Sequence, residues 1–393
     1  MPLRFDDLPR QFASRFDRDS FPTVIESINR ETAGRERDGE FDHLIAYALQ
    51  SDQFTSEPKI EPAQSAREYV QFGAIPAAVE RRLTGFLKAV TKPDDNIRLK
   101  YFSRLLAPDQ RNVPTLDYEY ERVMRFLYQK EFRGVKDAYE TRGHSTDTQV
   151  AANYAVWNAL AVIKASSPAT KIRKILIVGP GLDFAPRTEL VDVFRPQSFQ
   201  PYAVADAVLG LHLAQGEDLQ IDCVDINKRV IDFIDTFAVG NRLLHLYSEP
   251  GVADYNAYFA AIGHSIGVSA KGMKTRELPA SFLQRSIVVN AKAAASVHAV
   301  RLNIVTERLE ESYDLVVATN VLLYFNAKEL SLALTNIAKM LPAGGYFVHN
   351  DLRPVMEADG DALQMPAVAA RTVLIAQGQR APLYDSFSIC RKR

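Results

Sequence analysis

A set of residues in this chain shares one placement, at or just after the end of an apolar segment. They are Gly179, Gly181 and Asp183 in KILIVGPGLDFAP (174–186), Asp225 in QIDCVDIN, Asn320 in YDLVVATN, and His349 and Asp351 in GYFVHND. The carboxyl ends of parallel strands meet at one edge of an open α/β sheet, and ligands bind outside that edge. Turn chemistry explains any one of these residues, but their coincidence predicts a ligand site.

The Gly-Pro-Gly turn after the first segment indicates a bound ligand, because glycine lets a ligand approach the backbone closely. Its surroundings disfavour two common nucleotide sites. A phosphate-binding loop needs Gly-Lys-Ser/Thr after the turn, and a dinucleotide fingerprint needs a third glycine where Phe184 stands. Asp183 would repel a pyrophosphate and would instead suit a ligand that carries an ammonium group.

Asp225 and Asn320 each have a functional and a structural interpretation. Asp225 can accept both hydroxyls of a ribose in charge-assisted hydrogen bonds. It can equally cap the helix that NKRVIDF predicts. Asn320 can line the site of chemistry or form a turn. The sequence leaves both interpretations of each residue open.

The elements that must position these residues alternate from residue 172 onward. Near-continuous apolar runs predict parallel strands covered on both faces, at 174–179, 219–226, 299–305, 313–320 and 345–351. Helices fit between them, notably at 227–238 and 327–341. The tail, RTVLIAQGQRAPLYDSFSICRK, predicts two antiparallel strands around a short polar turn. We therefore expect a doubly wound, mostly parallel α/β sheet with a C-terminal antiparallel hairpin.

The N-terminal region predicts an all-helical domain. Apolar residues recur at helical spacing in PAAVERRLTGFLKAV (76–90), and similar patterns fill 41–50, 96–107 and 118–132. The charged stretch at 28–40 predicts at most a surface turn, and a further helix is expected to start near residue 146. The expected domains are therefore 1–170 (helical) and 171–393 (α/β), with an insertion at about 240–298. Aromatic residues in the insertion predict either a substrate lid or a packed satellite core: Tyr247, Tyr255, Tyr258 and Phe259.

The composition is that of an ordinary globular protein, with 47% hydrophobic and 24% charged residues. A net charge of −1 gives no reason to expect nucleic-acid or anionic-membrane partners. Cys223 and Cys390 lie in apolar runs and predict buried free thiols, and two cysteines do not make a metal site alone. No apolar run reaches membrane-spanning length, so we expect a cytoplasmic protein.

The motifs VGPGLDF, VDIN, YDLVVATNVLLYF and LPAGGYFVHND resemble, in order, those of class I S-adenosylmethionine (SAM)-dependent methyltransferases. The resemblance covers 172–393 and implies a Rossmann-like fold whose reversed last strand matches the predicted hairpin. NVLLYF, a helix and LPAGGYF are most similar to the chemotaxis-receptor glutamate methyltransferases. The N-terminal half does not follow theirs, so their substrate is not carried over.

The resemblance also implies cofactor contacts. Gly179 and Gly181 would accommodate the methionine part of SAM, with Asp183 nearby, and Asp225 would bind the ribose diol. Ile226 would lie against the adenine, and residues 305–307, centred on Thr306, would pass near its edge. Arg142, in the loop YETRGHSTDT (139–148), would pair with the SAM carboxylate.

These observations predict a methyltransferase (EC 2.1.1.-) acting on an unidentified small-molecule or protein acceptor. The cofactor brings its own leaving group, so the protein mainly supplies alignment and a dry pocket. His349, Asp351 and His144 are the candidate bases if the acceptor must lose a proton. Two alternatives stay open: a SAM-binding regulatory or interaction protein without transfer activity, and an NAD-dependent oxidoreductase, which Phe184 and the closing hairpin disfavour.

Overall fold

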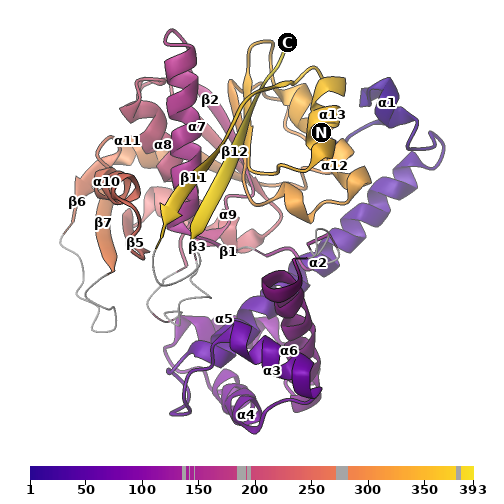
Figure 1. Cartoon of the computed structure of the whole chain (residues 1–393), viewed down its shortest axis with the longest axis vertical. Coiled ribbons are helices and arrows are strands. Elements are labelled where there is room, and N and C mark those ends of the chain that lie inside the picture. The colour runs from indigo at the N-terminus through magenta and orange to yellow at the C-terminus, as the bar shows by residue number, and fades with distance from the viewer. Residues whose placement is uncertain are drawn as a thin grey trace. The chain divides into compact units, whose positions relative to one another are not determined.

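The computed structural model describes residues 1–134, 139–140, 142–145, 147–183, 192, 196–270, 282–377 and 382–393. The chain divides into two compact units (Figure 1). A sheet unit contains residues 1–31, 147–183 and 196–393, and a helical unit contains residues 32–146 and 184–195. The division differs from the expected 1–170 and 171–393, because residues 1–31 and 147–170 belong with the sheet.

The sheet unit is built on a seven-stranded sheet in the order β11-β12-β10-β9-β2-β4-β8. Its strands are β2 (Lys174–Val178), β4 (Gln220–Asp225), β8 (Val297–Arg301), β9 (Leu315–Ala318), β10 (Tyr346–His349), β11 (Ala367–Ala376) and β12 (Leu383–Arg391). The pairs from β8 through β10 are parallel, whereas β12 runs antiparallel to both of its neighbours. From β2 the chain winds first toward β4 and then, through β9, the opposite way. The ends of β2 and β9 therefore form the switch point at which such sheets bind ligands.

The apolar runs placed four of the five parallel strands correctly. The expected strand at 299–305 instead occupies Val297–Arg301. The chain leaves the sheet early because the Asn303 side chain accepts the Val305 amide at 3.1 Å and closes a turn. The predicted hairpin is present, with Arg371 opposite Phe387. Its second strand, β12, enters between β10 and β11.

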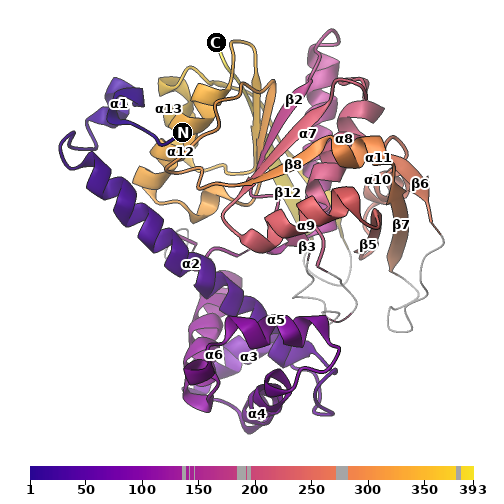
Figure 2. The ribbon, with the colours of Figure 1, turned by 180° about the vertical axis from the view of Figure 1, so that it is seen from behind.

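Helices cover both faces of this sheet (Figure 2). On one face α12 (Ala327–Met340) packs on β2, β9 and β10 in a single apolar cluster that also takes in N-terminal residues such as Phe12. Asn326 and Glu329 start α12 with a reciprocal capping box. The other face carries α7 (Asn153–Ser166), α8 (Gln200–Gly210) and α9 (Lys228–Val239). The sheet is thus buried on both sides, as its apolar strands require.

The insertion forms a three-stranded antiparallel sheet in the order β5-β7-β6. Its elements are β5 (Leu243–Ser248), α10 (Ala253–Ala261), β6 (Gly267–Ser269), β7 (Leu283–Val289) and α11 (Ala291–Ala295). Tyr255 is fully buried and meets the Tyr154 ring edge-on at 5.5 Å between centroids. Phe259 and Tyr247 are also buried. These aromatic residues therefore belong to a packed core, which is the second of the two expected roles.

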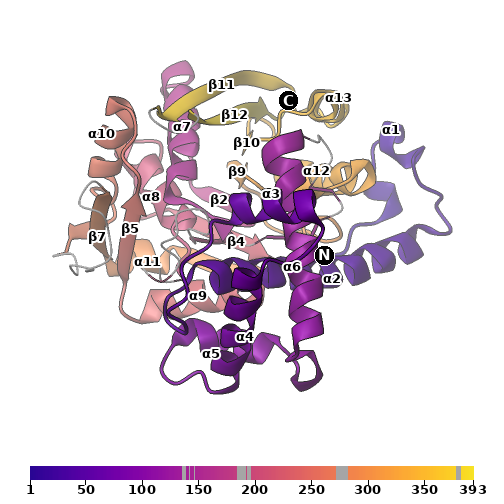
Figure 3. The ribbon, with the colours of Figure 1, turned by 60° about the horizontal axis from the view of Figure 1, so that its bottom comes forward.

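The helical unit has its own apolar core, drawn from five helices (Figure 3). They are α2 (Phe21–Gln50), α3 (Pro62–Phe72), α4 (Ala77–Thr91), α5 (Ile97–Leu105) and α6 (Val113–Tyr128). The prediction of a surface turn at 28–40 is wrong, because this stretch is the middle of α2. It lacks an apolar stripe but contains three arginines and three glutamates, which have high helix propensity. None of the helices in the described part of the chain is long and apolar enough to cross a bilayer.

Candidate functional site

The Gly-Pro-Gly turn leaves the sheet at the end of β2, where only glycine fits. Gly179 and Gly181 have φ angles of 63° and 65°, in the left-handed region. A Cβ atom on Gly179 would lie 2.5 Å from Cγ2 of Val321, which follows β9. The turn after β2 is therefore pressed against the segment after β9. Phe184, which bears on the dinucleotide alternative, lies outside the described residues.

Asp183 is a buried carboxyl group without an ion-pair partner in the part of the chain that the structure describes. It lies in β3 (Leu182–Asp183), which pairs in parallel with β1 (Asp147–Thr148) where a helix was expected to begin. The residue is 1% exposed, and neither carboxylate oxygen has a hydrogen-bond partner among the described residues. Burial raises its pKa to about 8; the Phe199 amide and the Gln197 side chain lower it only in part and stay outside hydrogen-bonding geometry. Such a group needs a ligand that donates hydrogen bonds or carries positive charge.

The segment before α8 adds further unsatisfied polar atoms beside Asp183. The Asp183 amide donates to the Gln197 carbonyl at 2.6 Å, so this segment runs alongside it. Ser198 Oγ and Gln200 Oε1 are buried without partners in the described part of the chain. Gln200 Nε2 donates to Thr319 Oγ1 at 2.8 Å, which connects α8 to the end of β9. Buried polar atoms without partners are rare in native proteins and are explained here by a polar ligand.

Sequence reasoning missed Ser198 and Gln200. Their segment, RPQSFQPYAVADAVLG (195–210), is not singled out by the sequence analysis. The available signal was Pro201, in the first turn of α8, which marks a helix start directly after these residues.

Asp225 ends β4, directly beside β2. Its Oδ1 accepts the Asn227 amide at 2.8 Å, and the side chain is largely buried. The N-cap of α9 is Asn227, whose side chain accepts the Arg229 amide at 2.9 Å. The helix-cap interpretation of Asp225 is therefore wrong, while its position at the strand end suits a ribose. Ile226 follows, half-buried, with its carbonyl accepting Arg301 Nε at 2.9 Å.

Asn320 follows β9 in the left-handed region, with φ of 59°. The backbone amide of Asn320 donates to Asn350 Oδ1 at 2.8 Å, and the side-chain Nδ2 of Asn350 donates to Asn320 Oδ1 at 2.8 Å. Asparagine tolerates this conformation better than most residues, but holding a non-glycine residue there costs free energy. The reciprocal pair holds Asn320 at the switch point, and both interpretations of this residue stay predictions.

Two candidate bases are engaged elsewhere. His349 is 2% exposed, and burial lowers its pKa to about 4. Its Nε2 lies 3.6 Å from Cys390 Sγ on the α12 face of the sheet. Asp351 forms an ion pair with Arg353, Oδ2 to Nη2 at 2.7 Å, and Arg353 in turn holds the Leu322 carbonyl. His349 is thus neutral and enclosed, and Asp351 fixes a loop.

The Thr306 side chain is engaged by the N-terminal segment. It is fully buried, and its Oγ1 donates to Asn29 Oδ1 at 2.7 Å while its carbonyl accepts the Leu3 amide at 2.9 Å. That residues 305–307 pass near the adenine edge stays a prediction.

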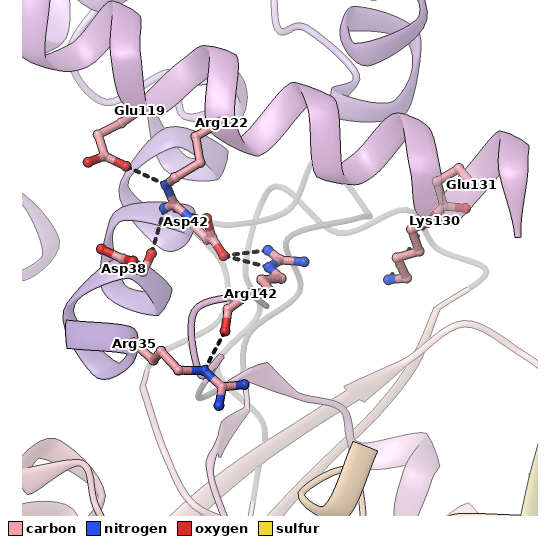
Figure 4. A network of polar contacts seen from close by, with 8 residues as sticks. All are labelled: Arg35, Asp38, Asp42, Glu119, Arg122, Lys130, Glu131 and Arg142. Carbon is pink, nitrogen blue, oxygen red and sulfur yellow. Dashed lines mark hydrogen bonds and ion pairs between the residues drawn. The ribbon is translucent and has the colours of Figure 1, made fainter. Parts of the chain in front are cut away.

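Arg142 and His144 belong to the helical unit, and Figure 4 shows the contacts of Arg142. Arg142 Nε donates to Asp42 Oδ2 at 2.8 Å, and the guanidinium lies 3.5 Å from the centre of the Phe126 ring. Burial, with a smaller contribution from Arg35, lowers the pKa of His144 to about 3. Asp42 therefore already partners Arg142, which was expected to bind a ligand carboxylate, and His144 is an uncharged, half-buried residue.

Residues 250–362 match the family model described as tellurite resistance protein TehB. No curated protein sequence matches the chain. Among solved structures, the N-methyltransferase NodS of Bradyrhizobium japonicum with S-adenosyl-L-homocysteine is 14% identical, with 60% of this chain and 85% of that chain covered and a TM-score of 0.33. The magnesium protoporphyrin IX methyltransferase ChlM of Synechocystis with bound SAM is 11% identical, with 72% and 94% covered and a TM-score of 0.33. A TehB-like SAM-dependent methyltransferase of Corynebacterium glutamicum is 13% identical, with 62% and 98% covered and a TM-score of 0.30.

The matched segment 250–362 contains β8, β9 and β10 and therefore Asn320, but neither Gly179 nor Asp225. Overlaps with TM-scores this low add nothing to the sheet order, on which the fold assignment rests. That order, with the reversed β12 between β10 and β11, gives this unit the Rossmann-like fold of class I methyltransferases.

Proposed function

We propose that the sheet unit binds SAM at the ends of β2, β4 and β9 and transfers its methyl group to an acceptor. The observation that carries the proposal is the Asp183 carboxyl beside the glycine turn, which has no hydrogen-bond partner among the described residues, with Asp225 ending β4, next to β2. These two acids at one sheet edge suit a ligand that carries both an ammonium group and a ribose.

The residues present fit SAM group by group. Asp183 would pair with its ammonium, Asp225 would accept its ribose hydroxyls, and Gly179 and Gly181 would let the chain pass without side-chain obstruction. When bound, SAM supplies a methyl group on a good leaving group. The protein's own task is then to align the acceptor with that methyl group and to exclude water.

The acceptor is the open part of this function. The activity falls in the class of methyl transfer to an unspecified acceptor (EC 2.1.1.-). The similarity of NVLLYF and LPAGGYF to chemotaxis-receptor methyltransferases concerns β9, β10 and the helix between them. The helical unit has no counterpart in that resemblance, so we do not propose their acceptor.

Calorimetric titration with SAM and with S-adenosylhomocysteine tests the proposal. Removing a charge-assisted hydrogen bond costs about 1.5–3 kcal/mol, so Asp225→Ala is expected to weaken binding about ten- to a hundredfold. Asp232→Ala is the matched control, because this aspartate is exposed on α9 and pairs only with Lys228 among the described residues. Absent binding at millimolar cofactor, or equal affinity in Asp225→Ala, would reject the proposal.

A second candidate is a SAM-binding regulator without transfer activity. The observation in its favour is that, of the candidate bases in the sheet unit, Asp351 is ion-paired with Arg353 and His349 is almost completely buried and neutral. The two functions are separated by incubating the protein with SAM and candidate acceptors. Acceptor-dependent formation of S-adenosylhomocysteine eliminates the regulator.

A further inference from the structure

Asp385, a residue the motifs do not include, lies at the same edge of the sheet as Asn320. It is the third residue of β12, which runs antiparallel to β10 with Ser388 opposite His349. The first residues of β12 therefore lie beyond the end of β10, where the switch-point residues gather (Figure 1). An acidic side chain within the apolar run LYDSFSIC was the available sequence signal.

A chain of contacts joins the glycine turn to this carboxyl group. Gly179 abuts Val321, and the preceding Asn320 exchanges hydrogen bonds with Asn350 at 2.8 Å in each direction. The Asn350 side chain is also near enough to Asp385 to lower the pKa of its carboxyl group. Asp385 therefore lies beside the Asn320–Asn350 pair at the end of β9.

Asp385 differs from the other acids at this edge in being partly accessible and without an ion-pair partner among the described residues. Its residue is half-buried, whereas Asp183 and Asp351 are almost completely enclosed. Oδ1 accepts the Ser386 amide at 2.8 Å. Burial raises its pKa to about 6, and the Ser386 amide and the Asn350 side chain lower the pKa in part. The carboxyl is therefore ionised at neutral pH and basic enough to take a proton.

We propose that Asp385 is the catalytic base on the acceptor side and that the acceptor carries an N–H or O–H group. This inference rests on the proposed function. In the step, the lone pair of the acceptor nitrogen or oxygen forms the bond to the methyl carbon. The S–CH3 bond breaks with its electron pair left on sulfur, and the acceptor proton passes to the Asp385 carboxylate. Charge thus balances without a further reactant.

A purely structural role for Asp385 would be to attach the hairpin to the end of β10. The two roles predict different effects of the bound cofactor on the pKa of Asp385. SAM carries a positive sulfonium, and S-adenosylhomocysteine carries a neutral thioether in the same place. If Asp385 lies near the methyl group, the sulfonium cation lowers its pKa by about 1 or more. If Asp385 only attaches the hairpin to β10, its pKa is the same with SAM and with S-adenosylhomocysteine.

The experiment is a carboxyl carbon-13 NMR titration of the full chain, saturated in turn with SAM and with S-adenosylhomocysteine. The Asp385 signal is assigned from its loss in Asp385→Asn, or in Asp385→Glu if the first variant does not fold. The expected result is a pKa at least about 1 lower with SAM than with S-adenosylhomocysteine. Identical titrations overturn the inference.

Affinity separates this inference from the proposed function. Asp385→Asn is expected to bind S-adenosylhomocysteine within twofold of the parent protein, with Asp235→Asn on the exposed face of α9 as the matched control. A tenfold loss of affinity in Asp385→Asn would place the residue in the cofactor site and refute an acceptor-side role. Absence of any cofactor binding would reject the proposed function itself.

Discussion

Asp42 in the helical unit and Asp183 in the sheet unit are both buried aspartates with opposite surroundings. Asp42 accepts Arg122 Nη2 at 2.8 Å on one oxygen and Arg142 Nε at 2.8 Å on the other (Figure 4). Asp183 has no partner on either oxygen among the described residues, and burial raises its pKa to about 8. Residues of its own unit hydrogen-bond to both oxygens of Asp42, whereas the described residues hydrogen-bond to neither oxygen of Asp183.

The contrast separates a structural network from a ligand site. Arg122 also binds Glu119, and Arg35 Nε donates to the Arg142 carbonyl, so the charges around Asp42 satisfy one another. Such a network ties the loop at 142–145 to α2 and α6 and offers a ligand little. An orphaned buried carboxyl is expensive unless something outside the chain completes it. Completeness of hydrogen bonding therefore distinguishes the two regions better than residue type does.

The largest expected effect follows from breaking the complete network. Asp42→Ala leaves two largely buried guanidinium groups without their shared partner, which typically costs about 3–5 kcal/mol. Asp183→Ala removes a group that has no partner to lose, so its cost at pH 7 is expected to be well below that of Asp42→Ala. Urea unfolding of both variants measures the difference. Equal destabilisation would show that the two carboxyl groups do not differ in their hydrogen bonding.

For binding of SAM, Asp183 is expected to matter more than Asp42. At pH 7 the Asp183 carboxyl is protonated in the free protein, because its pKa is about 8. Pairing with an ammonium ionises it, so cofactor binding should release up to one proton and tighten as pH rises toward 8. Calorimetry in two buffers of different ionisation enthalpy counts that proton.

Asp183→Asn should abolish the proton release and weaken binding about ten- to a hundredfold. Asp42→Asn serves as its counterpart, with proton release unchanged provided that the variant remains folded. Release that persists in Asp183→Asn would assign the proton to another group.

The pH dependence of stability gives a smaller effect. The folded pKa of Asp183, about 8, lies above its unfolded value near 3.8, so the folded state holds the proton more tightly between these values. Raising the pH through this window therefore destabilises the free protein. Asp183→Asn should flatten that decline in urea midpoints measured from pH 5 to pH 8. An unchanged slope would show that the carboxyl is solvated in solution.

The sheet was more predictable than the helical unit, for a physical reason. Strands buried on both faces must be apolar throughout, so β2, β4, β9 and β10 appear directly in the sequence. Helix α2 is amphipathic only in part, and its middle depends on helix propensity and on the charges around Asp42. Those partners come from distant residues such as Arg122, which a local pattern does not contain.

The same distinction applies to the candidate site. Residues at strand ends, such as Asp225 and Asn320, follow from topology and were identified from sequence. Whether a side chain there is available depends on contacts between distant segments. Thr306 is covered by the N-terminal segment, Arg142 is paired with Asp42, and Asp385 lies near Asn350. None of these pairings is visible in the local sequence.

The smallest expected effects come from two glycines in α2, within the stretch that the sequence did not predict to be helical. A Cβ atom on Gly34 meets nothing within 4 Å, so Gly34→Ala should stabilise the protein by about 0.5–1 kcal/mol through helix propensity. A Cβ atom on Gly39 would lie 1.9 Å from the His144 carbonyl oxygen. Gly39→Ala should therefore destabilise it, because α2 and the loop at 142–145 meet there backbone to backbone. Urea midpoints of the two variants test the contact between α2 and the loop at 142–145. A stabilising Gly39→Ala would mean that this loop does not lie against α2.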